Sequence, residues 1–235
     1  MSLNFSRIKN SRFITRLFSL LTGDPIGFIK TVIFNFRYLP FAQAKRFPVF
    51  ISGRTRVVYC RSGFYIGGGR TGDLTFGFVD KQYIYSKPCH LCIEGSIITI
   101  GNGMHDFGPG CVLSISKDAE LVLGNNFASS YDLHLRVAKR VEVGDDNMWS
   151  YGIEVRDTDS HKIYNTEGER VNPDRPVILG DKVWIGCRCT ILKGVKIASN
   201  TIVAASSVVS SSQKNSNTII SSDGKVIKTF RRWSR

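Results

Sequence analysis

An aliphatic residue occupies every sixth position between residues 179 and 209 of this 235-residue chain. The set is Leu179, Ile185, Ile191, Ile197, Val203 and Val209. A helix repeats its buried side every 3.6 residues and a strand every 2 residues, so neither alone sustains a period of six. Short strands wound into a triangular coil do sustain it. The period therefore predicts a solenoid of short parallel strands.

The residues between these aliphatic positions are small, as a narrow core requires. Four residues after each of the first five aliphatics come Val183, Cys189, Val195, Thr201 and Ser207. The residues directly after the aliphatics are also small, except Leu192: they are Gly180, Gly186, Ala198 and Ala204. This is the hexapeptide repeat of left-handed parallel β-helices. We therefore predict an all-β solenoid, a left-handed parallel β-helix with a helical N-terminal segment, an extruded loop and a basic C-terminal tail.

The pattern divides the chain into three parts. Residues 1–46 form a basic, amphipathic helical segment, residues 47–210 form the β-helix, and residues 211–235 form a tail whose GKVIKTFRRW sequence has helical tendency. The repeat is interrupted at about 155–176 by a polar stretch rich in turn formers. An insertion between coils must project from the surface, so we expect an extruded loop there.

The N-terminal segment carries eight basic residues against one acidic residue, Asp24. Apolar residues at helical spacing lie beside Arg12 and Arg16 and predict an amphipathic helix that Gly23 and Pro25 end: Phe13, Leu17, Leu20 and Leu21. Such a helix suits either a membrane surface or a cap over the open end of the solenoid. The apolar stretch 26–34 is too short to span a bilayer, and no signal peptide is recognisable, so we expect a cytoplasmic protein, with contact to the inner face of the membrane left open.

The formal charge of +13 indicates a preference for polyanions or an anionic surface. No nucleic-acid-binding module is recognisable, so we expect no nucleic-acid partner; acidic glycans, coenzyme A phosphates and an anionic membrane leaflet remain. Cys89 and Cys92 flank His90, but no second ligand pair follows them. We therefore expect reduced thiols and no metal site.

The extruded loop contains His161, which follows Asp157 and Asp159. An imidazole is the usual general base for a hydroxyl, and either carboxylate could orient it or contact the acceptor. The alternative is an exposed histidine with no role. On the neighbouring coils His134 and Trp184 should face outward, and Trp184 would then pack against a neighbouring subunit or form part of a ligand wall.

Several strings resemble the hexapeptide-repeat acyltransferases, specifically the O-acetyltransferases of bacterial capsule and lipopolysaccharide biosynthesis. They are DTDSHKIYN, GERVNPDRPVILGDKVWIGCRCTILKGVKI, IVAASSVVSSS, GKVIKTFRRW and the upstream FIKTVIFNFRYLP. The resemblance implies a homotrimer that binds acetyl-CoA between adjacent subunits, with His161 as the base that directs acetyl transfer to a sugar hydroxyl of a surface polysaccharide or of its lipid-linked or nucleotide precursor. An amino-sugar N-acyltransferase and a non-catalytic scaffold remain alternatives.

The same resemblance implies the positions of the binding residues. The groove for acetyl-CoA would involve Trp184, Gly186, Cys187, Ala205, Ser210, Lys225 and Lys228, with the two lysines near the phosphates. The acceptor would meet Ser130, His134 and Arg136. Relatives that act on maltose or galactosides carry asparagine near Ser130 and aspartate near Arg136, so we do not expect a small neutral sugar of that kind as the acceptor. The net positive charge and the basic N-terminal segment favour an anionic or membrane-tethered glycan. The family's glycine-small-proline turn is replaced here by residues 221–224.

Overall fold

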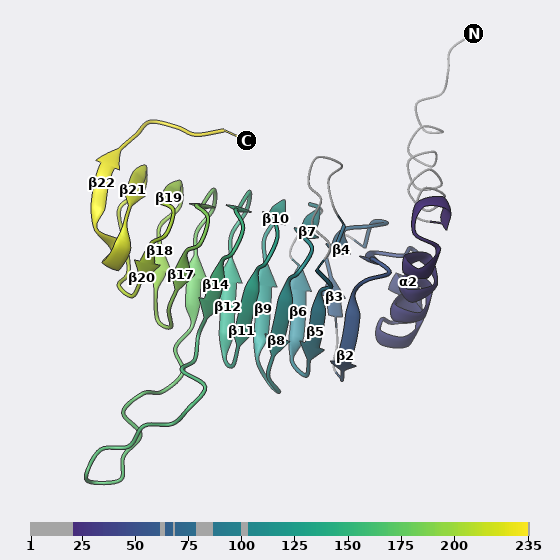
Figure 1. Cartoon of the computed structure of the whole chain (residues 1–235), viewed down its shortest axis with the longest axis horizontal. Helices are drawn as coiled ribbons and strands as arrows, with labels where there is room; N and C mark the ends of the chain where they lie inside the picture. The colour runs from purple at the N-terminus through teal and green to yellow at the C-terminus, as the bar shows by residue number, and fades with distance from the viewer. Residues whose placement is uncertain (1–20, 62–63, 68, 79–86, 100–102, 235) are drawn as a thin grey trace.

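The computed structural model describes residues 21–234 except 62–63, 68, 79–86 and 100–102. Figure 1 shows an elongated solenoid of stacked coils, with a helix across one end, an antiparallel strand at the other and one long loop projecting from the side. The strands stack into three parallel sheets, which we name faces A, B and C. This confirms the predicted left-handed parallel β-helix.

Each face takes one strand from nearly every coil. Face A contains β1 (Val49–Ile51), β4 (Leu74–Phe76), β7 (His105–Phe107), β10 (Phe127–Ser129), β13 (Met148–Trp149), β16 (Trp184–Ile185), β19 (Thr201–Val203), β21 (Thr218–Ile220) and β22 (Val226–Thr229). Face B contains β2 (Arg56–Cys60), β5 (His90–Ile93), β8 (Val112–Ile115), β11 (His134–Val137), β14 (Glu154–Arg156), β17 (Thr190–Ile191) and β20 (Val208–Val209). Face C contains β3 (Phe64–Ile66), β6 (Ser96–Thr99), β9 (Glu120–Leu123), β12 (Arg140–Val143), β15 (Val177–Leu179) and β18 (Lys196–Ile197).

The core lies along the axis of the solenoid. All six aliphatics of the repeat and all five small residues between them are buried, as the sequence predicted. In the earlier coils face A fills the interior with a column of aromatic rings, from Phe76 through Phe107 and Phe127 to Trp149, with neighbouring centroids 4.9 to 5.1 Å apart. Coils that place like side chains at the same register pack ring on ring, so each coil stabilises the next.

Helix α2 (Pro25–Tyr38) closes the N-terminal end of the solenoid. Asp24 caps it by accepting from the backbone N–H of Gly27 at 2.9 Å and of Gly53 at 2.6 Å. Asn35 donates to the carbonyl of Val49 at 2.6 Å and accepts from its N–H at 3.2 Å. One turn earlier, the Thr31 hydroxyl accepts from the N–H of Ile51 at 2.9 Å. These side chains replace the missing strand at the edge of face A, so the helix is a cap.

The amphipathic helix predicted around residues 13–21 lies outside the described residues, apart from helical backbone at 21–23. A short helix, α3 (Phe41–Ala44), follows α2. No helix in the described part of the chain combines the length and apolar character needed to cross a bilayer.

The C-terminal tail differs from the prediction. The stacking continues past residue 210, because β21 pairs parallel with β19. A turn at Ser222–Gly224 then leads into β22, which is a strand and not a helix and pairs antiparallel with β21. The helical expectation was wrong because Val226, Ile227 and Thr229 are β-branched and because the free edge of β21 offers hydrogen bonds that a surface helix would not use.

We predict that Asn35→Leu lowers the free energy of unfolding by about 2–4 kcal/mol, because it leaves both buried backbone groups of Val49 without a partner. Urea unfolding of the full chain measures this. Ile33→Ala on the exposed side of the same helix is the control and should stay within about 0.5 kcal/mol of the wild type. Equal midpoints for the wild type and Asn35→Leu would show that the cap does not depend on this side chain.

Candidate functional site

The long loop, residues 157–176, leaves the solenoid at the corner between faces B and C, where β14 ends and β15 has not begun (Figure 1). Its two ends are tied together, because the N–H of Arg175 donates to the carbonyl of Asp157 at 3.0 Å. The carbonyl of Arg175 in turn accepts from the N–H of Gly194, on the next coil, also at 3.0 Å. The loop therefore starts from a fixed base.

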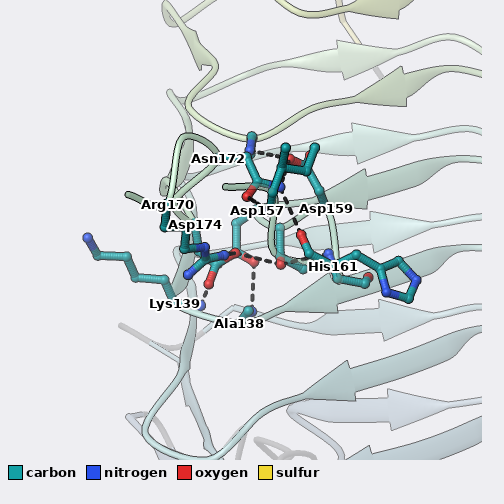
Figure 2. A network of polar contacts seen from close by, with 12 residues as sticks. Ala138, Lys139, Asp157, Asp159, His161, Arg170, Asn172 and Asp174 are labelled. Atoms are coloured by element: carbon teal, nitrogen blue, oxygen red, sulfur yellow. Dashed lines mark hydrogen bonds and ion pairs between the residues drawn. The ribbon is translucent and has the colours of Figure 1, made fainter. Parts of the chain in front are cut away.

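Asp157 is fully buried at this base. Its carboxylate accepts from the backbone N–H groups of Ala138, Lys139 and Arg140, each at 2.7 Å (Figure 2). These three bonds give the backbone N–H groups of the turn before β12 an acceptor, and they compensate the cost of burying the charge. Asp157 thus holds the previous coil in place, and the suggestion that it orients His161 is wrong for this structure.

Asn172 clamps the segment that carries His161. Its side-chain oxygen accepts from the N–H of Ile163 at 2.7 Å. Its amide nitrogen donates to the His161 carbonyl at 2.8 Å and to the Asp159 carboxylate at 2.9 Å. The side chain is 8% exposed, so these bonds are made largely away from water. One side chain therefore fixes three alternate residues around the histidine.

Two further carboxylates anchor the loop. Asp159 forms an ion pair with Lys193 on the next coil, and the hydrogen bonds from Lys193 and Asn172 hold the pKa of Asp159 below its ordinary value of 3.8. Asp174 accepts from the Thr158 hydroxyl at 2.6 Å and from Arg170 at 3.0 Å, and these bonds lower its pKa too. A depressed folded-state pKa gives stability that is lost only as the pH falls through that lower value. Both anchors are therefore intact at neutral pH.

The imidazole of His161 is exposed and points away from this polar network (Figure 2). Among the described residues, no hydrogen bond reaches its ring nitrogens, so neither Asp157 nor Asp159 orients the ring directly. Asp159 acts on the backbone of His161 through Asn172 instead. The structure thus presents a free imidazole on a rigid stem.

The outer surface of face B lies beside the base of the loop. His134 projects outward from β11, as predicted, and so does Arg136; both lie next to Glu154 and Arg156 of β14 in register. Arg136 donates to the Ser160 hydroxyl at 2.6 Å, which links this surface to the histidine segment. Arg156 forms an ion pair with Glu154. Ser130, the remaining predicted acceptor residue, is exposed at the other edge of face B.

The predicted groove residues Gly186, Cys187 and Ala205 stack at a different corner, between faces A and B. A side chain at Gly186 would put its Cβ 2.7 Å from the backbone nitrogen of Ala205, so glycine is required for the coils to approach. The nearby Cys187 thiol raises the pKa of Tyr151. Its ring also stacks on Tyr131 at 4.8 Å, a contact that sequence reasoning missed.

Trp184 faces outward as predicted, and its partner is the C-terminal tail of the same chain. The ring of Trp233 lies 6.0 Å from that of Trp184, and the Trp233 indole donates to the Lys182 carbonyl at 3.0 Å. The tail therefore runs back along the solenoid (Figure 1). Lys225 and Lys228 are exposed on this returning segment.

Ser210, another predicted groove residue, lies directly after the end of β20. Its hydroxyl donates to the Asp223 carboxylate at 2.7 Å, so it ties the turn before β22 to the last coil of face B.

The thiols of the C-x-x-C pair do not converge. Cys89 is buried in the core, where it donates to the Gly108 carbonyl at 3.3 Å. Cys92 lies on the outward side of β5, opposite in direction to buried Leu91 and Ile93. Within the described residues, no group of three potential ligands could hold a metal ion.

Comparison with known proteins matches residues 176–211 to the family described as bacterial transferase hexapeptide (six repeats). The polysialic acid O-acetyltransferase of Neisseria meningitidis is 34% identical over 112 residues, which are 45% of this chain and 50% of that protein. The putative lipopolysaccharide biosynthesis O-acetyl transferase WbbJ of Escherichia coli K12 is 25% identical over 167 residues, 67% of this chain and 84% of that protein. The crystal structure of the polysialic acid O-acetyltransferase OatWY superposes with a TM-score of 0.47 at 25% identity, covering 76% of this chain and 87% of that one.

The match to the first of these relatives spans about half of its length. The hexapeptide match falls on β15 to β20, the coils whose every sixth side chain is buried. Both of these sequence relatives are O-acetyltransferases by name, one of polysialic acid and the other of lipopolysaccharide biosynthesis. Over residues 176–211 the chain is therefore similar to the bacterial hexapeptide-repeat transferases.

Proposed function

We propose that this protein is an acetyl-CoA-dependent O-acetyltransferase that modifies a hydroxyl of a bacterial surface polysaccharide or of its precursor. The observation that carries the proposal is the exposed imidazole of His161, held on a stem that Asn172 and the Asp159–Lys193 pair make rigid. A general base needs a free ring nitrogen in a fixed place. The O-acetyltransferase names of the two sequence relatives supply the reaction class.

In the proposed mechanism, His161 takes the proton of the acceptor hydroxyl while that oxygen attacks the thioester carbonyl. The backbone N–H of Cys187 would stabilise the oxyanion that forms. The carbon–sulfur bond then breaks, and the imidazolium returns its proton to the departing thiolate, giving an acetyl ester and free coenzyme A. No acyl-enzyme is needed, because the imidazole handles both proton transfers.

The arrangement of the two half-sites supports a homotrimer. His161 projects at the corner between faces B and C, whereas Cys187 and Ala205 lie at the corner between faces A and B. Within a single chain, the proposed base and the proposed groove are therefore separated by the width of one face. In a closed ring of three copies, one chain's loop meets its neighbour's groove, and cyclic symmetry repeats the pairing.

We propose an acidic glycan as the acceptor. One relative's name specifies polysialic acid, and Arg136 lies beside the histidine segment through Ser160. An exposed guanidinium that holds only a neutral hydroxyl retains donors for a carboxylate. His134 and Ser130 lie on the same or the adjoining surface and would contact neutral parts of the glycan.

We expect His161→Ala to reduce kcat by about 10² to 10⁴, the usual contribution of a general base. The measurement is acetyl-CoA-dependent thiol release with a panel of acidic and neutral bacterial glycans, polysialic acid included. His90→Ala, a histidine on an earlier coil, should retain wild-type turnover. Full activity of His161→Ala would refute the assignment of the base, and turnover with amino sugars alone would favour an N-acyltransferase.

Asn172→Ala should lower kcat about 10- to 100-fold and leave the KM for acetyl-CoA unchanged, because it frees the backbone around His161 without touching the groove. The matched control is Asn165→Ala, because Asn165 lies in the same loop but makes its hydrogen bonds only near the tip of the loop. This variant should have little effect on kcat. Equal losses in both variants, or a rise in the KM for acetyl-CoA, would mean that Asn172 only stabilises the loop.

Lys225→Gln and Lys228→Gln should each raise the KM for acetyl-CoA by about three- to tenfold at constant kcat, since each removes a point charge for a phosphate. Acetyl-dephospho-CoA lacks one of the phosphates of acetyl-CoA. With this substrate, at least one of the two variants should therefore have the same KM as the wild type. Lys214→Gln, which changes an exposed lysine before β21, is the control. An unchanged KM in both variants would show that these two lysines are merely solvated and do not bind the phosphates.

A further inference from the structure

The outward side of the N-terminal cap carries a stripe of exposed apolar residues. Its residues on α2 are spaced by three and four, which places them on one side of a helix. The stripe comprises Ile26, Ile29, Ile33 and Phe36 of α2 together with Phe41 of α3, and these side chains are 48% to 72% exposed. The opposite side of α2, with Thr31, Phe34 and Asn35, is buried against β1. The stripe therefore does not contribute to closing the end of the solenoid.

The basic residues are concentrated in the part of the sequence that contains this cap. Residues 1–72 contain twelve basic residues and a single acidic one, whereas residues 73–235 contain twenty basic and eighteen acidic ones. The single acid, Asp24, is occupied as the cap of α2 by two backbone N–H groups. Arg37, Lys45 and Arg46 are exposed next to the stripe. Nearly all of the net charge of +13 thus belongs to the part of the sequence that contains the cap and not to the part that contains the histidine loop.

An apolar stripe flanked by basic residues on a helix that lies flat across one end of a protein is the arrangement of an interfacial membrane anchor. We propose that the outer stripe of α2 and α3 docks this protein on an anionic phospholipid surface. The apolar side chains would enter the headgroup region while the basic residues meet lipid phosphates. Figure 1 places α2 across the end of the solenoid, so the coils would extend away from the bilayer.

The charge argues against the other occupants of the stripe. A second copy would bring an equally basic end against this one, and like charges repel at close range. Residues 1–20 would add Arg7, Lys9, Arg12 and Arg16 to a face that is already basic. An anionic surface is the partner whose charge complements the whole of this end. The inference does not rest on the proposed acetyl transfer.

Co-sedimentation of the full chain with lipid vesicles tests the proposal without any acetyl acceptor. The wild type should bind vesicles containing about one third phosphatidylglycerol and should not bind pure phosphatidylcholine. Raising the salt from about 0.1 M to about 0.5 M should weaken binding severalfold, because the Debye length shortens. Absence of binding to the anionic vesicles would overturn the proposal.

The double variant Ile29→Ser/Ile33→Ser removes the centre of the stripe without adding charge. We expect its vesicle binding to fall by at least about tenfold, since two inserted side chains are lost. Ile227→Ser is the matched control, because Ile227 is 59% exposed on β22 at the opposite end of the solenoid, and it should bind as the wild type does.

Native mass and thermal melting of both variants complete the test. Unchanged values for the double variant, together with lost binding, support the membrane surface. Retained binding would assign the membrane contact to another segment and overturn the proposal. A lower native mass in the double variant would show that the stripe joins copies of this chain, which also overturns it.

Discussion

Backbone hydrogen bonds between successive coils hold this protein together, and they impose a constraint at both ends. Each coil has too few inward side chains to fold alone, so it depends on the coil before and the coil after it. The first and last coils each lack one neighbour and would leave a row of unpaired N–H and C=O groups. The chain meets this need with two devices. Thr31 and Asn35 of α2 bond to the edge of β1, and β22 turns back to pair with β21.

The same stacking makes the solenoid a rigid base for the loop. Residues 157–176 cannot enter the core, so they project, but they are tied to the coils on both sides. Asp157 binds the coil before the loop, and Asp159 binds Lys193 on the coil after it. Asn172 then fixes the backbone around His161. An exposed imidazole becomes useful for chemistry when its stem is held in this way.

The total charge of the chain has a different meaning once its location is known. A net charge of +13 invites the interpretation that the acceptor is a polyanion. The basic excess lies almost entirely in residues 1–72, the part of the sequence that contains the cap, whereas the surface beside the loop pairs Arg156 with Glu154. The proposal of an acidic acceptor therefore depends on Arg136 and on the relative named for polysialic acid, not on the overall charge.

The sequence by itself determined the fold, because a period of six is a local pattern that only one kind of coil satisfies. It placed the buried aliphatics, the outward Trp184 and the extruded loop with its histidine. It could not show that Asn172 holds His161 or that Lys193 reaches back to Asp159, because these partners are brought together only by the register between coils. It also could not show that the tail would add a strand to the edge of β21, or that one side of α2 would stay uncovered. Periodicity reports what each residue faces within its own coil; only the stacked structure decides what it meets on the next one.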